Sequence, residues 1–245
     1  MAARGTDPDR MSFLEHLEEL RSRLLRSLLA LVVGFFLAWP VSGRIYEFLV
    51  VPVKASLPPG EKLAYTGISD PFLLYTKLSV FAAIFLAFPY VLLQFWLFVA
   101  PGLYPRERKW VIPFVTVASI FFFMGAAFAY VVVVPYACRY FITLGVEAGF
   151  RPVITIREVF SFLLQLILAC GGIFELPVVV FFLTRIGLLT PAFLWHYFGY
   201  AFFVVWALAA FMTPPDVISM AMVAVPMTLL YLLSILISWV FMPRK

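Results

Sequence analysis

Acidic side chains close to arginines are the first candidates for chemistry in this chain. The segment MSFLEHLEELRSRLL (Met11 to Leu25) holds three glutamates and two arginines within nine residues, although only 13% of the chain is charged. Its apolar residues recur at three- and four-residue spacing, which predicts a helix with one apolar stripe, and Glu19 lies off that stripe. Glu19 and Arg23 form an i,i+4 pair. A helix on a membrane surface would explain the arginines, but an anionic inner leaflet repels acids, so it explains Glu19 poorly.

A second acid, Glu107, stands in the segment FVAPGLYPRERKW between two long apolar runs, where Pro101 and Gly102 break any helix. One interpretation is a solvated loop charge paired with the neighbouring arginines. The other is that Glu19 and Glu107 bind one ligand with two guanidinium groups, because arginine and carboxylate pair through two parallel hydrogen bonds.

The third acid, Glu175, lies inside an apolar run, CGGIFELPVVVFF. An ionised acid near the middle of a membrane costs about 2.5–3.5 kcal/mol or more, so Glu175 should face protein or a water-filled cavity. Gly171 and Gly172 permit close approach of a neighbouring helix, and Pro177 frees a backbone carbonyl. A protonated glutamate bonded to another helix is the structural alternative, but we expect an intramembrane polar site. The sequence has no nucleotide-binding, zinc-protease or nucleophile-elbow motif, so we expect no enzyme, no cofactor and no metal.

The elements that must position these acids are membrane-spanning helices. Hydrophobic residues make up 64% of the chain, against about 45–50% of a soluble protein, and a bilayer is crossed by about 20 apolar residues. We therefore expect an all-α membrane protein with six transmembrane helices in one domain over residues 12–242, between a disordered tail at 1–11 and a short tail at 243–245. The expected spans are about 22–41, 71–100, 109–135, 158–185, 191–212 and 217–242.

Basic residues set the expected orientation. An even number of spans puts both termini on one side, and the excess of arginine and lysine in the short loops of that side places both termini in the cytoplasm. The net charge of +5 is then a topology signal, and no nucleic-acid partner is expected. Both cysteines, Cys138 and Cys170, lie in or beside apolar runs; we expect free thiols, although a disulfide is an alternative.

The expected helices are uneven in length and interrupted. Thr190 and Asp70 each precede a proline, which predicts a capped helix start at both places. The run 71–100 is longer than a bilayer needs, whereas 191–212 is short, so the last two spans should form a tight hairpin that can thin the membrane. Prolines inside the spans predict kinked helices and a curved, cupped bundle. These prolines are Pro89, Pro113, Pro177 and Pro226.

Four motifs in order carry a family resemblance: HLEELRSRLL, FVAPGLYPRER, FELP and TPPD. Over about residues 12–242 the chain resembles the TatC family, the six-helix integral subunit of the twin-arginine protein translocase. The resemblance implies a signal-peptide site, an intramembrane polar site at Glu175, and outer-loop or partner-docking positions. The signal-peptide residues are Glu19, Leu20, Arg21, Phe98 and Glu107, and the outer-loop and docking residues are Pro52, Phe211, Met212 and Asp216. The sequence has Asp70 in SDPF where we expected a glutamate, which leaves that detail of the outer loop open.

The resemblance also implies a function. A member of this family is the receptor and core subunit that binds twin-arginine signal peptides of folded proteins in the bacterial cytoplasmic (inner) membrane and nucleates an export complex driven by the proton gradient. Its partners would be single-span subunits of TatA and TatB type, the lipid bilayer and further copies of itself. An ion-coupled small-solute transporter is the alternative. It would explain Glu175, but it gives no reason for Glu19 and Glu107.

Overall fold

The computed structural model describes residues 13–58, 60–99, 111–150, 153–213 and 216–242. In these residues the chain is helical, and outside the helices it forms one isolated bridge, between Ala64 and Thr155. The elements are α1 (Phe13–Ala38), the 3-10 helix η1 (Trp39–Val41), α2 (Ser42–Ser56), α3 (Asp70–Val99), α5 (Val111–Phe128), the π-helix η3 (Ala129–Val133), α6 (Val134–Glu147), α7 (Ile156–Ile173), α8 (Leu176–Arg185), α9 (Pro191–His196), α10 (Phe198–Met212) and α11 (Val217–Phe241).

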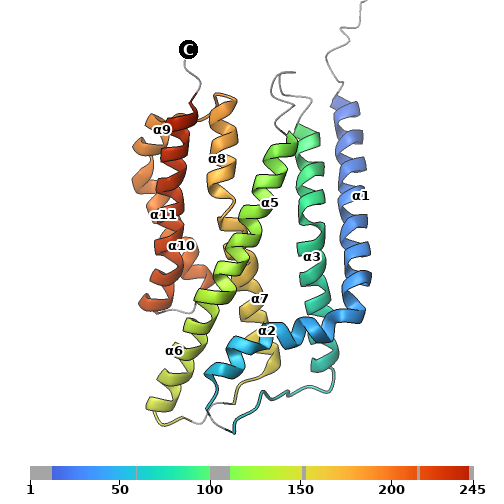
Figure 1. Cartoon of the computed structure of the whole chain (residues 1–245), viewed down its shortest axis with the longest axis vertical. Coiled ribbons are helices and arrows are strands. Elements are labelled where there is room, and N and C mark those ends of the chain that lie inside the picture. The colour runs from blue at the N-terminus through green and yellow to red at the C-terminus, as the bar shows by residue number, and fades with distance from the viewer. Residues whose placement is uncertain (1–12, 59, 100–110, 151–152, 214–215, 243–245) are drawn as a thin grey trace, which may run out of the picture.

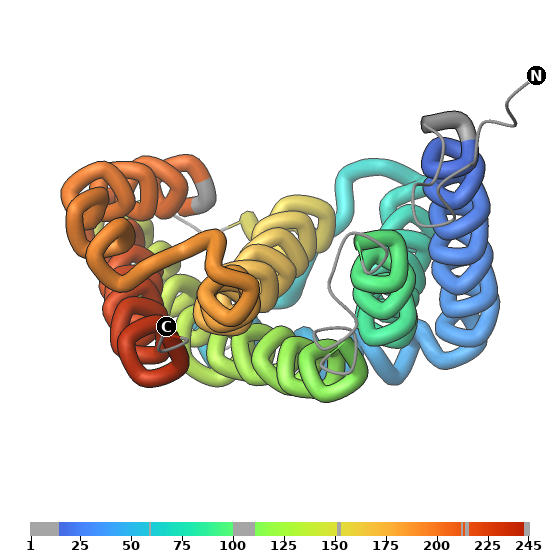
Figure 2. The backbone as a smooth tube through the Cα atoms, turned by 90° about the horizontal axis from the view of Figure 1, so that it is seen from above, coloured from blue at the N-terminus to red at the C-terminus, as the bar shows by residue number. Residues whose placement is uncertain are grey.

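The helices form an open curve, as the sequence led us to expect. Seen from above, the pair α1 and α3 stands at one end, the pair α10 and α11 at the other, and α5 lies between them (Figure 2). α1 packs on α3, α5 packs on α3 and α7, and α11 packs on α8 and α10. α1 begins and α11 ends at the same end of the molecule (Figure 1). We call this the rim end, and the opposite end, where α2 and the end of α6 lie, the outer end.

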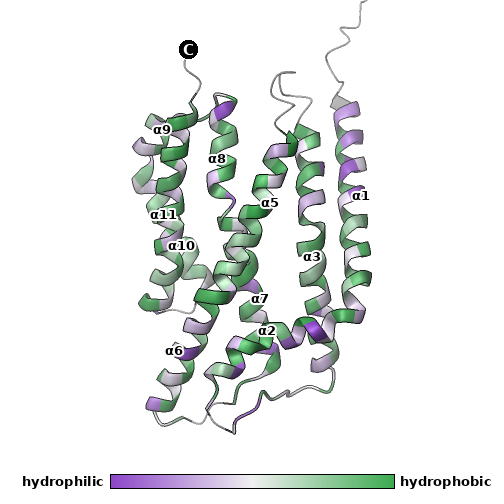
Figure 3. Ribbon diagram, viewed as in Figure 1, coloured by the Kyte–Doolittle hydropathy of each residue, from purple (hydrophilic) through white to green (hydrophobic). Residues whose placement is uncertain are grey.

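In the part of the chain that the structure describes, five helical stretches are long and apolar enough to cross a membrane, and a sixth, Phe198–Phe211, is apolar but shorter. Hydrophobic residues fill the middle of the molecule, and hydrophilic ones gather at the start of α1, the end of α8 and near α2 and α6 (Figure 3). The long stretches are Glu15–Ser56, Asp70–Val99, Val111–Glu147, Ile156–Arg185 and Val217–Phe241. The short α10 fits the expectation of a short helix within the last hairpin.

The first helix differs from the expected span. We expected a span at about 22–41, and α1 runs unbroken from Phe13 to Ala38, so the helix begins before the expected span. Its first turns are rich in leucine, glutamate and arginine, which are good helix formers. Pro40 then ends the helix because it has no N–H for the ladder. The acidic segment is therefore the first third of a long helix.

Helix α2 contains Pro52, the residue that the family resemblance assigns to an outer-loop position. Pro52 is buried inside α2. A proline removes the hydrogen bond to the carbonyl four residues earlier, here that of Phe48. The hydroxyl of Tyr130, in η3, donates to this carbonyl at 2.6 Å, and the two rings stack with centroids 4.5 Å apart. The π-helix thus supplies the donor that the proline lacks, and the segment stays helical.

Two other expected spans are divided. The span expected at 158–185 breaks between α7 and α8, where Pro177 lies at the start of α8. The span expected at 191–212 divides at Tyr197 into α9 and α10. By contrast, α3 and α11 continue through Pro89 and Pro226.

The helix starts give one confirmation and one correction. The hydroxyl of Thr190 caps α9 by accepting from the N–H of Phe193 at 3.2 Å. The carboxylate of Asp70 turns back into the preceding loop and accepts from the N–H groups of Thr66 (3.1 Å) and Gly67 (2.7 Å). Asp70 therefore fixes the outer loop in front of α3, and it does not cap the helix as predicted.

Close contact between α5 and α7 positions the end of α7, where the break before α8 lies. A Cβ at Gly125 would lie 2.5 Å from the carbonyl oxygen of Cys170 and 2.7 Å from the ring of Phe174. Gly171 is equally tight against Phe122, whereas a Cβ at Gly172 would meet nothing within 4 Å. The predicted close approach is thus made by Gly171 and not by Gly172.

Candidate functional site

The start of α1 is held against the end of α3 by polar and aromatic contacts. The ring of His16 stacks on Phe98 with centroids 4.5 Å apart. Two turns further along α1, the Nη1 of Arg23 donates to the Oε1 of Gln94 at 3.1 Å. Gln94 is 5% exposed, so this bond satisfies a buried amide. These contacts join two segments more than seventy residues apart at the rim end.

Glu19 is the acid at the centre of these contacts. Its Oε1 accepts two hydrogen bonds from Arg23, from Nη2 at 2.7 Å and from Nε at 3.0 Å. The two side chains are only 18% and 19% exposed. The second oxygen of Glu19, Oε2, is buried and has no hydrogen-bond donor among the residues that the structure describes. A buried carboxylate oxygen without a donor is costly, so Oε2 is suited to accept a hydrogen bond from a cationic ligand.

Three of the other predicted rim residues lie within the part of the chain that the structure describes. Leu20 is 42% exposed and Arg21 is exposed, both one or two residues from Glu19 on α1. Phe98 is half-buried beneath His16. Glu107 lies outside the described residues. The structure therefore brings Glu19 and Phe98 to one place, with Leu20 and Arg21 beside them.

Glu175 occupies the break between α7 and α8. This break lies partway between the rim end and the outer end of the molecule (Figure 1). Its N–H bonds to the carbonyl of Gly172 at 3.2 Å, and its own carbonyl accepts the N–H groups of Val178 and Val179. The side chain is half-buried, and its Oε1 has no partner in the described part of the chain. The backbone of Glu175 is thus fixed by hydrogen bonds, and its carboxyl group has unused hydrogen-bonding capacity.

The remaining predicted positions lie on other elements. Asp216 caps α11, since its Oδ1 accepts from the N–H of Ser219 at 2.7 Å. Phe211, near the end of α10, is 90% exposed, and the side chain of Met212 is outside the described set. Pro52 is buried in α2, on a different element from the rim.

Sequence reasoning predicted the pair of Glu19 and Arg23 but missed Gln94, which accepts a hydrogen bond from Arg23. Arg23 was interpreted as half of a helix pair and as a topology signal, and Gln94 was passed over. The available signal was that Gln94 is an uncharged polar residue in an otherwise apolar run. A second missed contact joins α3 and α7, where the Nζ of Lys77 donates to the hydroxyl of Ser161 at 2.9 Å.

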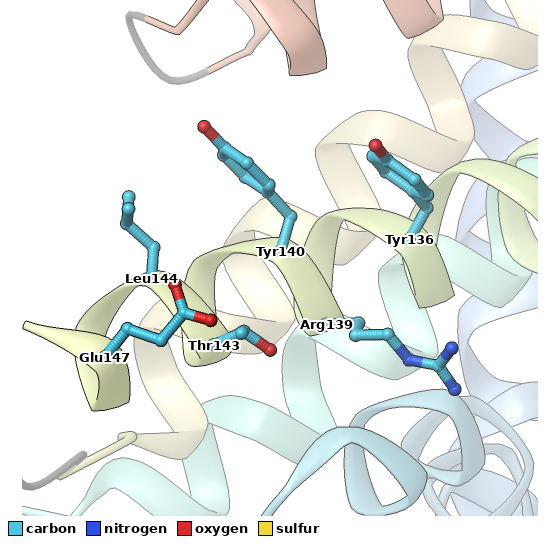
Figure 4. A pocket seen from close by; sticks show the side chains of 6 residues that line it. All are labelled: Tyr136, Arg139, Tyr140, Thr143, Leu144 and Glu147. Atoms are coloured by element: carbon cyan, nitrogen blue, oxygen red, sulfur yellow. The ribbon is translucent and has the colours of Figure 1, made fainter.

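An open hollow of about 280 Å³ lies along α6, away from all of these positions. In Figure 4 Tyr136 and Tyr140 point to one side of the helix, and Arg139 points to the other. No predicted site residue that the structure describes lines it. Its lining is Tyr136, Arg139, Tyr140, Thr143, Leu144 and Glu147. Within the described ranges no three His, Cys, Asp or Glu side chains come together in a way that could hold a metal ion, and Cys138 and Cys170 are free thiols.

Known proteins resemble the chain over nearly its whole length. The family model for "Sec-independent protein translocase protein (TatC)" matches residues 15–226. A protein of that name from Koribacter versatilis is 40% identical over 239 residues, which cover 96% of this chain and 88% of the relative. One from Campylobacter jejuni is 43% identical over 223 residues, 91% of each chain. A solved structure, "Crystal Structure of Twin Arginine Translocase Receptor- TatC", superposes with a TM-score of 0.81 at 32% identity and covers 92% of this chain and 99% of that one.

Proposed function

The chain belongs to the TatC family of Sec-independent protein translocase proteins, and on this premise we propose that its α1–α3 rim receives the paired arginines of export signal peptides. It is a multi-pass bacterial membrane protein that acts in twin-arginine protein translocation. The geometry of the rim end indicates which of its surfaces binds the signal peptide.

One observation carries the assignment of the rim. Glu19 stands in the sequence between two residues with exposed side chains, Glu18 and Leu20. Its Oε1 is held by Arg23, and its Oε2 is buried with no donor among the described residues. A guanidinium group can donate from two nitrogens, so an incoming arginine fits this site better than a lysine, which is a point charge. Glu107 is the second acid of the proposal on sequence grounds.

The rest of the signal peptide needs an apolar surface. Leu20 is exposed next to Glu19, and the leucine-rich face of α1 beyond it is exposed down the helix. We place the apolar stretch of the signal along this side of the bundle. The rim end would then face the cytoplasm of the cell, with the protein in the inner membrane and the export step driven by the proton gradient.

Partner subunits belong at the other end of the curve. The exposed aromatic residues of the short α10, with Phe211 90% exposed, offer an apolar face to single-span subunits of TatA and TatB type, and further copies of the chain would complete the receptor complex. Glu175 would be the polar contact for a partner helix. Replacing Glu175 with alanine should reduce disulfide cross-linking between engineered cysteines on α10 and on a partner helix; unchanged cross-linking would contradict this role.

Binding of a signal peptide tests the proposal for the rim. A peptide with two arginines should bind the purified protein in nanodiscs more tightly than the same peptide with two lysines. Glu19→Gln should abolish most of that difference, because it removes the charge and keeps the shape. A solute transporter would not distinguish the two peptides, so equal affinities, or a difference that survives Glu19→Gln, would overturn the proposal.

A further inference from the structure

We infer that Arg23 is an internal guanidinium that occupies Glu19 in the empty receptor, and that an incoming arginine binds by taking over Oε1 while Gln94 keeps hold of Arg23. This inference rests on the proposed function of the rim and concerns how its site is regulated. It makes Arg23 a residue that determines specificity, although it does not itself bind the signal.

The contacts of Arg23 support this interpretation. It donates to the carboxylate of Glu19 from two nitrogens, which is how a signal arginine would donate. Both bonds go to Oε1, and Oε2 has no donor among the described residues, so a guanidinium that donates to Oε2 is placed to displace Arg23 from Oε1. The site is therefore closed by a group of the same chemistry as its ligand.

Gln94 gives Arg23 a second acceptor. Its Oε1 already holds the Nη1 of Arg23 at 3.1 Å, from a different helix and from a buried position. When a ligand binds Glu19, Arg23 keeps its hydrogen bond to Gln94. The guanidinium of Arg23 therefore still has a hydrogen-bond acceptor. Displacement then exchanges one arginine–glutamate pair for another, which makes it nearly balanced in free energy.

Because Arg23 already binds Glu19, any other cation must bind Glu19 strongly enough to displace Arg23. A lysine ammonium is a compact point charge with all its N–H groups on one nitrogen and cannot donate from two nitrogens of a planar group, so it competes with Arg23 at a disadvantage. Arginine pairs would thus be selected both by attraction to Glu19 and by competition with Arg23. Removing Arg23 should tighten binding of all cationic peptides and reduce the preference for arginine over lysine.

The experiment measures peptide affinity for the full chain in nanodiscs. Arg23→Gln should bind the two-arginine peptide about two- to fivefold more tightly, the size expected for loss of a helix ion pair. Arg26→Gln is the matched control, because Arg26 is exposed on the same helix and its loss changes the net charge equally. Arg23→Lys retains the charge, and it should give a smaller tightening than Arg23→Gln.

Further variants distinguish a failure of this inference from a failure of the proposed signal-peptide binding at the rim. Gln94→Met removes the second acceptor and should weaken binding about two- to fivefold, since Arg23 then has only Glu19. Glu19→Gln combined with Arg23→Gln should show no tightening over Glu19→Gln alone. If Arg23→Gln and Arg23→Lys, both with native helicity and melting temperature, bind no more tightly than Arg26→Gln, the inference fails. The rim proposal fails only if Glu19→Gln leaves arginine-dependent binding intact.

Discussion

Tyr130 should stabilise the protein only as long as residue 52 is a proline. The hydroxyl of Tyr130 donates at 2.6 Å to the carbonyl of Phe48, which Pro52 cannot reach with an N–H. A hydrogen bond of this kind contributes about 1 kcal/mol. Tyr130→Phe should therefore lower the melting temperature by about 2–4 °C in a chain of this size.

A double-mutant cycle isolates the cause. In Pro52→Ala, the new N–H of residue 52 can take the carbonyl of Phe48 within α2, so adding Tyr130→Phe should cost much less than it does in the native chain. Tyr136→Phe is the control, because it removes a hydroxyl from the neighbouring helix α6 at a tyrosine that is 43% exposed. Thermal unfolding in one detergent, followed by circular dichroism, gives all values. An equal loss on Tyr130→Phe in both backgrounds would refute the reasoning.

Three further substitutions test the packing that positions the site, all by thermal unfolding. Gly125→Ala should destabilise the folded protein by about 1–3 kcal/mol, because the new Cβ would lie 2.5 Å from a backbone oxygen of α7. Gly172→Ala, with free space around the new Cβ, should leave the stability unchanged or raise it. Equal changes in stability for the two variants would contradict the close contact at Gly125. Thr184→Val should lower the stability of the fold by about 1 kcal/mol, because the hydroxyl of Thr184 donates to that of Ser238 at 2.9 Å and both residues are fully buried. Thr116→Val at an exposed position is the control, and an equal loss of stability in both variants would contradict the prediction. Asp216→Ala should cost about 1 kcal/mol through loss of the α11 cap and Asp216→Asn much less; equal losses would exclude capping.

Hydropathy was sufficient to predict an all-helical membrane fold because lipid requires long apolar helices. The expected ranges 71–100 and 217–242 lie within a residue or two of α3 and α11. Local signals also located the cap of α9 at Thr190.

Other features depend on contacts between distant segments. Helix α2 was missed because Pro52 normally argues against a helix, and the donor that compensates for it comes from Tyr130, 78 residues later. The predicted pair of Glu19 and Arg23 is present, but its anchor on Gln94 is set by the packing of α1 on α3, which periodicity does not encode. The break at Glu175 was only half predicted: Pro177 indicated a kink, but the glycine contacts that fix its position require both helices.

Photocross-linking from the rim tests the central claim most directly. A photoreactive residue placed at Leu20, which is exposed beside Glu19, should capture a two-arginine signal peptide in membrane vesicles, and a two-lysine peptide should be captured much less. The same residue at Phe203, which is 72% exposed on α10 at the far end of the curve, is the control. Capture at Leu20 that depends on both arginines is the predicted result, and capture at Phe203 with none at Leu20 would contradict the account.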